Sequence, residues 1–226
     1  MYRIGIDLGG TNIAVGIVDD EHKIVVKKST PTLAKRPPEE IVADMARVCL
    51  EACAELNVNI KDIANIGIAS PGIANPVNGC VEYANNLPFR RFPIVKLLSE
   101  NLGVDSSIIK IANDANAAAW GEAVAGAAKG TSNSIMVTLG TGVGGGIVLD
   151  GKVYSGFNHA GAEFGHIVIE KDGKRIAVIA VCEHEYSYAL ENRRGARPFD
   201  PFDTLLDVRR AKANADRVIV LYHGGK

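Results

Sequence analysis

A strand–glycine–strand pattern that occurs twice constrains the fold of this chain more than any other feature. Residues 4–20 (IGIDLGGTNIAVGIVDD) and 135–150 (IMVTLGTGVGGGIVLD) align after a one-residue gap, and in each a glycine-rich turn joins two apolar segments. Alternating apolar residues are typical of strands, and glycines between two such segments are typical of a hairpin. Self-similarity of this kind predicts two related lobes, with a chance match between simple hairpins as the alternative.

Both glycine-rich turns suit the binding of a polyphosphate. Phosphate oxygens approach backbone N–H groups closely only where side chains leave room, and glycine leaves that room. Neither turn is a Walker loop, because no Lys-Ser or Lys-Thr pair follows the glycines. Plain hairpin turns are the alternative, which one hairpin alone would favour. The two expected phosphate edges are Gly9, Gly10 and Thr11 in the first turn and Gly140, Thr141, Gly142 and Gly144 in the second.

The remaining periodicity predicts the alternating strands and helices of an α/β protein. A helix is expected to begin at Pro37-Pro38, with acidic residues in its first turn. Because no two cysteines form a CxxC motif, Cys49 and Cys53 are interpreted as core residues of this helix. Its apolar stripe consists of Val42, Met45, Cys49, Cys53 and Leu56. Further elements are expected at residues 24–30, 63–69 and 108–112 (strands) and 115–128 (helix).

Two other groups of polar residues suggest chemistry. Asp114 follows the strand at 108–112 and enters a helix, a position from which a carboxylate can face a cleft. A helix N-cap is the alternative role for this aspartate. In the segment HAGAEFGH, Glu163 lies between His159 and His166, a set that suits sugar hydroxyls or a metal, although such a loop cluster is often inert.

Five motifs together resemble the ROK family of sugar kinases. They are DLGGTNIAVGIVD, Ser-Pro-Gly at 70–72, Asn-Asp at 113–114, LGTGVGGGIV and HAGAEFGHI, in the order and spacing of that family over roughly residues 3–173. The resemblance implies an α/β fold of the actin/hexokinase-like (ribonuclease H-like) type, with two lobes. It also implies that a hexose and MgATP meet in the cleft between the lobes.

The resemblance assigns a role to each motif residue. Asp114 would be the catalytic base. The hexose would contact Gly72, Asn113, Glu163 and His166. The phosphates of ATP would contact Asp7, Gly9, Gly10, Thr11, Asn12, Gly140, Thr141, Gly142 and Gly144. ATP and Mg²⁺ are therefore the expected cofactors.

The sequence departs from the family after about residue 173. The cysteine cluster CxCGxxGCxE that follows His166 in relatives is absent, so we expect no structural zinc and no other metal ligand set. The tail predicts strands at 176–181 and 217–222 around a helix at 203–215, and it resembles a fragment of the poly-γ-glutamate capsule-synthesis (metallophosphatase-like) family. The expected domains are a kinase lobe at 1–118, the start of a second lobe at 119–173 and an unrelated tail at 174–226, joined near Lys174.

The overall charge excludes several classes of partner. The 226 residues carry a formal net charge of −1 without a strong basic cluster, so neither nucleic acid nor a membrane surface is expected as a partner. No 18-residue apolar run and no signal peptide are present, so we expect a cytoplasmic protein, with a homodimer left open.

The expected function follows from these interpretations. It is the ATP-dependent phosphorylation of a hexose, as in a glucokinase, impaired because much of the second lobe is missing. A non-catalytic sugar-binding protein of the same family and an inactive fusion fragment are the alternatives.

Overall fold

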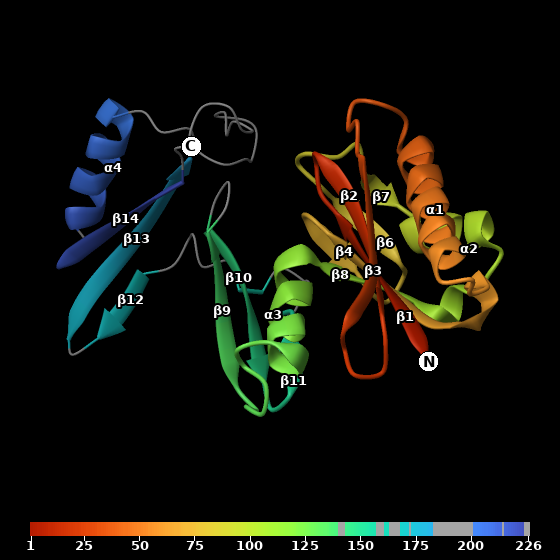
Figure 1. The fold of residues 1–226 in the computed structure, drawn as a ribbon. Helices are drawn as coiled ribbons and strands as arrows, with labels where there is room; N and C mark the ends of the chain where they lie inside the picture. The colour runs from red at the N-terminus through yellow and green to blue at the C-terminus, as the bar shows by residue number, and fades with distance from the viewer. Residues whose placement is uncertain are drawn as a thin grey trace. The chain divides into compact units, whose positions relative to one another are not determined.

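The computed structural model describes most of the chain as two compact units. The described residues are 1–139, 143–156, 161–162, 168–171, 173–182, 201–213 and 215–223. The first unit comprises Met1–Thr131 and the second Ser132–Lys226. Figure 1 labels most of their helices and strands, and each unit is described by itself below.

The first unit contains a five-stranded sheet in the order β3-β2-β1-β4-β8. Its strands are β1 (Tyr2–Leu8), β2 (Asn12–Val18), β3 (Ile24–Pro31), β4 (Ile63–Ser70) and β8 (Ile109–Asn113). The first three strands form an antiparallel meander, whereas β4 and β8 run parallel to β1. Alternate residues of β1 are buried, as expected where one face of a sheet packs on the core. The strands predicted at 24–30, 63–69 and 108–112 are confirmed to within a residue or two.

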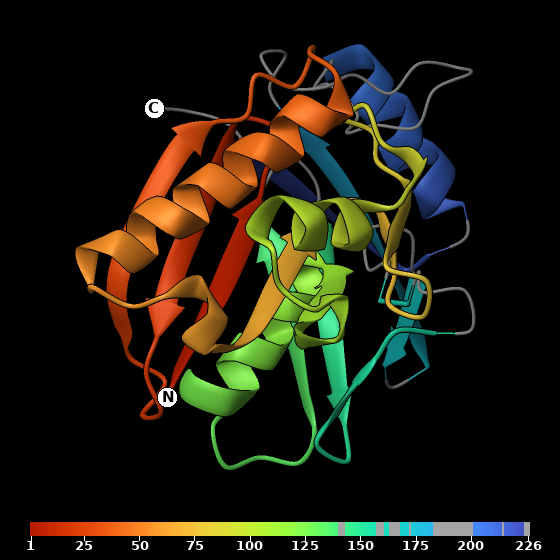
Figure 2. The same ribbon diagram turned by 90° about the vertical axis from the view of Figure 1, so that its right-hand side faces the viewer.

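Three helices belong to the first unit: α1 (Pro38–Glu55), α2 (Ile94–Leu102) and α3 (Asp114–Ala125). Helix α1 has proline at its first position and buries four residues of the predicted stripe, Val42, Met45, Cys49 and Cys53. The fifth, Leu56, lies just after the helix and is only half-buried. It contacts β2 and β3, and Figure 2 shows it lying across these strands. Helix α2 ends at Gly103, whose φ of +64° favours glycine. No helix within the described ranges is both long and apolar enough to cross a membrane.

A small second sheet in the first unit was not predicted from the sequence. It pairs β5 (Ile73–Asn75), β6 (Cys80–Tyr83) and β7 (Arg90–Phe92) in that order. Phe89 is fully buried and stacks on Phe92, with 5.0 Å between the ring centroids. Two short 3-10 turns, η1 (Ile60–Asp62) and η2 (Ser106–Ile108), precede β4 and β8.

The second unit begins with a meander that repeats the one at the start of the chain. Strands β9 (Ser134–Leu139), β10 (Val143–Leu149) and β11 (Lys152–Tyr154) form a sheet in the order β11-β10-β9. The first three strands of the chain have the corresponding order, β3-β2-β1. This shared arrangement supports the internal repeat inferred from the two glycine-rich segments.

The tail forms a strand–helix–strand unit, as its sequence predicts. Strands β13 (Lys174–Cys182) and β14 (Arg217–His223) pair in parallel, and α4 (Pro201–Lys212) contacts both. Strand β12 (Val168–Lys171) pairs with β13 in an antiparallel hairpin that includes the expected joint near Lys174. The predicted domains at 1–118, 119–173 and 174–226 were defined by the family that each part of the sequence resembles. Their boundaries stay a prediction.

The packing of α1 generates a stability prediction. Met45 is fully buried, whereas Leu50 on the same helix is 43% exposed. We expect Met45→Ala to lower the free energy of unfolding of the full chain by about 2–5 kcal/mol, because it removes core contacts and leaves a cavity. The control Leu50→Ala should lower it by less than about 1 kcal/mol. Chemical denaturation measures both, and equal losses would contradict this description of the core.

Candidate functional site

The parallel strands of the first sheet bring polar residues to one edge. In the observed register Asp7 of β1 lies beside Ala69 of β4, and Ser70 lies beside Asn113 of β8. Because these strands are parallel, their carboxyl ends meet at the same edge of the sheet, which is where open α/β sheets bind ligands. Three of the predicted site residues, Asp7, Asn113 and Asp114, therefore lie at the same edge of the sheet.

Asn113, not Asp114, caps helix α3. The Asn113 backbone is extended, and its side-chain Oδ1 accepts a hydrogen bond of 3.1 Å from the N–H of Asn116. Its Nδ2 donates to the carbonyl oxygen of Gly72 at 3.1 Å. The alternative role of Asp114 as the N-cap is therefore wrong, because Asn113 already occupies that position. Asp114 is the first helical residue, and its Oδ1 accepts from the N–H of Ala115 at 2.8 Å.

The surroundings of Asp114 favour its protonated form. Although the residue is exposed overall, neighbouring atoms displace part of the water around its carboxyl group, and this desolvation raises its pKa. The negative charge of Asp7 raises the pKa further, while the hydrogen bond from Ala115 opposes the shift. A carboxylate with a raised pKa is a stronger base than an ordinary aspartate. The site thus contains one carboxylate suited to accepting a proton.

The first glycine-rich turn is a tight loop with free N–H groups. The N–H of Gly9 donates to the carbonyl of Asn12 at 2.9 Å, and a Cβ added at Gly9 would lie 3.0 Å from that same oxygen. A Cβ at Gly10 would lie 3.1 Å from the Cβ of Asn86. No hydrogen bond between described residues uses the N–H groups of Gly10 and Thr11. These two donors are available to an anion.

Only glycine can occupy position 72 in this backbone conformation. Its φ is +82°, and an added Cβ would lie 2.1 Å from the carbonyl oxygen of Tyr83. The Gly72 carbonyl is fixed by the side chain of Asn113. This arrangement joins the loop after β4 to the start of α3, so backbone and side chains of the site are held together.

Several predicted site residues lie outside the described residues or in the other unit. Glu163, His166, Gly140, Thr141 and Gly142 are not among the described residues. Gly144 lies in β10 of the second unit, where it pairs with Thr138. Their predicted roles stay predictions. Within the described part of the chain, no group of three His, Cys, Asp or Glu residues is placed to hold a metal ion.

Three residues around the site were not predicted from the sequence. Asn86 packs against Gly10, Thr32 contacts the same turn, and Asn116 lies in α3 with 5% of its surface exposed. Among the residues that the structure describes, the Oδ1 of Asn116 has no hydrogen-bond partner. Only Asn116 carries a signal in the sequence, because asparagine is unfavourable in an alanine-rich helix. The other two depend on contacts between distant segments.

Known proteins share both the sequence and the fold of this region. The model of the ROK family matches residues 3–184. Glucokinase of Streptomyces coelicolor is 39% identical over 170 residues, and glucokinase of Thermotoga maritima is 36% identical over 171 residues. These alignments cover 75% of this chain and 50% and 51% of the two relatives. The chain thus spans about half the length of the curated relatives it matches.

Comparison with solved structures also indicates the ROK family. The ROK family glucokinase from Streptomyces griseus, in complex with glucose and AMPPNP, matches with a TM-score of 0.65 and 35% sequence identity. The match covers 75% of this chain and 51% of that one. The expected actin/hexokinase-like fold is therefore confirmed for the matched part. The family match ends at residue 184, and the resemblance of the tail to capsule-synthesis proteins finds no support here. Over residues 3–184, the greater part of its length, this chain belongs to the ROK family.

Proposed function

We propose that this chain carries the base and both phosphate-binding turns of an ATP-dependent hexose kinase, with glucose as the first substrate to test. The observation that carries the proposal is the position of Asp114 at the same sheet edge as Asp7, whose charge contributes to the raised pKa of Asp114. The identity to two glucokinases supports it, as does the structural neighbour that holds glucose and AMPPNP.

In the proposed reaction Asp114 orients a hexose hydroxyl group and accepts its proton as the phosphoryl group is transferred. General-base assistance of this kind contributes about 10²–10⁴ to a rate. One N–H of the Asn113 amide already binds Gly72, and the amide has a second N–H that can donate to the sugar. The loop at Gly72 approaches the sugar with its backbone. Glu163 and His166 are proposed as further sugar contacts.

The nucleotide phosphates are proposed to bind the glycine-rich turns. The N–H groups of Gly10 and Thr11 supply neutral donors in the first turn, flanked by Gly9 and Asn12. The second edge consists of Gly140, Thr141, Gly142 and Gly144. Because phosphoryl transfer needs mainly positioning and charge stabilisation, backbone donors of this kind suit it.

The acidic pair at the sheet edge fits a magnesium ion. The charge of Asp7 disfavours ionisation of Asp114, and a divalent cation relieves such repulsion. Mg²⁺ is typically held by one or two carboxylates together with substrate phosphates, so the described site does not need a larger cluster of ligands. Asp7 is the residue proposed to hold it. The ion neutralises charge on the phosphates when bound.

Replacing the proposed base separates its catalytic role from a structural one. We expect Asp114→Asn to keep the affinity for glucose and to lower phosphoryl transfer by about 10²–10⁴. The matched control is Asp105→Asn at the start of η2, where asparagine accepts the hydrogen bond from Ser107 equally well. Calorimetry measures binding, and a sensitive assay for hexose phosphate measures turnover. Wild-type turnover in Asp114→Asn would contradict the assignment.

We also propose that the 226 residues tested by themselves are a poor kinase. They match about half the length of the relatives, and a displacement of about 1 Å in a reacting group costs roughly a hundredfold in rate. A coupled assay should therefore give a turnover below the usual range of about 1–10³ s⁻¹. Turnover within that range would contradict the proposal. Glucose binding without any turnover would instead favour the alternative of a non-catalytic sugar-binding protein.

A further inference from the structure

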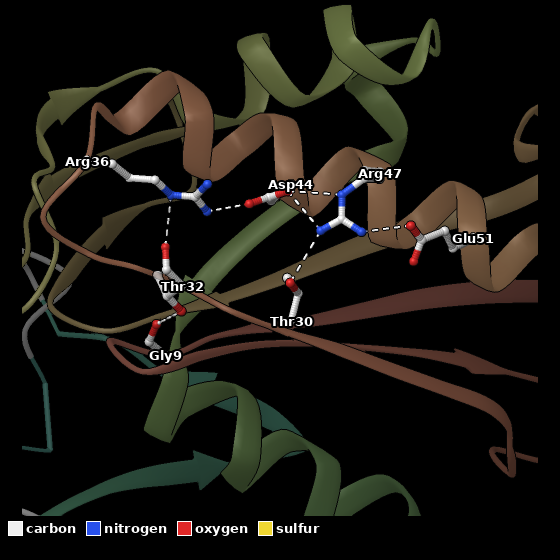
Figure 3. Close-up of polar contacts among 7 residues, drawn as sticks. All are labelled: Gly9, Thr30, Thr32, Arg36, Asp44, Arg47 and Glu51. Carbon is white, nitrogen blue, oxygen red and sulfur yellow. Dashed lines mark hydrogen bonds and ion pairs between the residues drawn. The ribbon is translucent and has the colours of Figure 1, made fainter.

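A buried threonine holds the first glycine-rich turn from behind. Thr32 directly follows β3 and has no exposed surface. Its hydroxyl group donates to the carbonyl oxygen of Gly9 at 2.7 Å, and its N–H donates to the carbonyl oxygen of Thr11 at 2.8 Å. Figure 3 shows the Thr32 side chain directed at Gly9. One residue thus anchors the carbonyl groups on both sides of Gly10.

The hydrogen bond from Thr32 to Gly9 determines where the N–H of Gly10 points. A peptide unit is planar and trans, so its C=O and N–H groups point in opposite directions. Because Thr32 holds the carbonyl of Gly9, the N–H of Gly10 in the same peptide unit is directed away from Thr32. That N–H makes no hydrogen bond with any described residue. The hydrogen bond from Thr32 therefore leaves the N–H of Gly10 as a free donor on the side of the turn that faces away from Thr32.

Thr32 is itself held by Arg36, which precedes helix α1 and is paired to it through Asp44. The Nε of Arg36 donates to the carbonyl oxygen of Thr32 at 3.1 Å, and the Arg36 guanidinium forms an ion pair with Asp44 at 2.5 Å. The side chains of Arg36 and Asp44 are only 19% and 22% exposed, so this pair is less screened by water than an ordinary surface pair. Arg47 binds the same carboxylate (Figure 3). A chain of contacts thus runs from α1 to the turn.

We infer that Thr32 is a positioning residue for nucleotide binding. It does not touch the nucleotide in this scheme. It fixes the Gly9–Gly10 peptide unit so that the N–H of Gly10 is already directed at a phosphate oxygen before the nucleotide arrives. Preorganisation of this kind increases affinity because less ordering is needed on binding. The inference rests on the proposed function, since it assigns a phosphate to this turn.

The first test compares two substitutions of Thr32. Thr32→Val keeps the shape and removes the hydroxyl donor, whereas Thr32→Ser keeps that donor. In titrations of the full chain with MgATP, Thr32→Val should raise the dissociation constant about twofold to tenfold. Thr32→Ser should restore most of the affinity, and the dissociation constant for glucose should stay unchanged in both. Equal weakening of MgATP and glucose, or no weakening of either, would overturn the inference.

The matched control is Thr30→Val, two residues earlier. The Thr30 hydroxyl accepts a hydrogen bond from Arg47 at 3.3 Å, whereas the Thr32 hydroxyl is bonded to Gly9 of the turn (Figure 3). This variant loses a threonine hydroxyl from the same network without releasing the turn. It should bind MgATP as the wild type does. A loss of affinity equal to that of Thr32→Val would show that the network, not the turn, is responsible, and would overturn the inference.

A second readout separates this inference from the proposed function. If the wild-type chain does not bind MgATP, the proposed function fails, and the positioning role is decided by the free protein. Nuclear magnetic resonance should then show a lower order parameter for the Gly10 amide in Thr32→Val than in the wild type, Thr32→Ser and Thr30→Val. An unchanged Gly10 order parameter in Thr32→Val would overturn the inference, whether or not nucleotide binds.

Discussion

The register of three parallel strands, β1, β4 and β8, determines where Asp7, Asn113 and Asp114 of the site lie. Ile6, Ile68 and Ile111 are paired across these strands, and each has no more than 4% of its surface exposed. A slip of one residue would move this apolar row to the opposite face of the sheet, at the cost of burying polar groups. The buried isoleucines thereby fix Asp7 one residue further along and place Asn113 and Asp114 at the same edge.

The site holds two carboxylates, Asp7 and Asp114, at one edge of a sheet whose loops are fixed by side-chain hydrogen bonds. Asn113 links the Gly72 loop to helix α3, and Thr32 links the glycine-rich turn to helix α1. Within this frame desolvation, and with it the negative charge of Asp7, raises the pKa of Asp114. Groups whose pKa values are perturbed by a specific neighbour are typical of functional sites. In the proposed function Asp7 would hold a cation and Asp114 would accept a proton, so the proposal gives both carboxylates a use.

Much of this architecture is predictable from local sequence patterns, but the contacts that complete the site are not. The β1–β2 hairpin, helix α1 and the strand–helix–strand tail follow from periodicity over long segments. The sheet β5-β6-β7 was missed because strands of three or four residues show almost no periodicity. Asn113 and Asp114 are both good caps, and only the backbone angles distinguish them. Thr32 reaches Gly9 through the β2–β3 register, which no local pattern encodes.

The central claim is that the described sheet edge belongs to a site for a hexose and MgATP. Thermal unfolding of the full chain with glucose, with MgATP and with both tests it most directly. A ligand that binds only the folded protein adds about 2.7 kcal/mol of stability at one hundred times its dissociation constant. The account predicts a rise in the unfolding midpoint with glucose and a further rise when MgATP is added. A midpoint that neither ligand moves, in a protein shown to be folded, would contradict it.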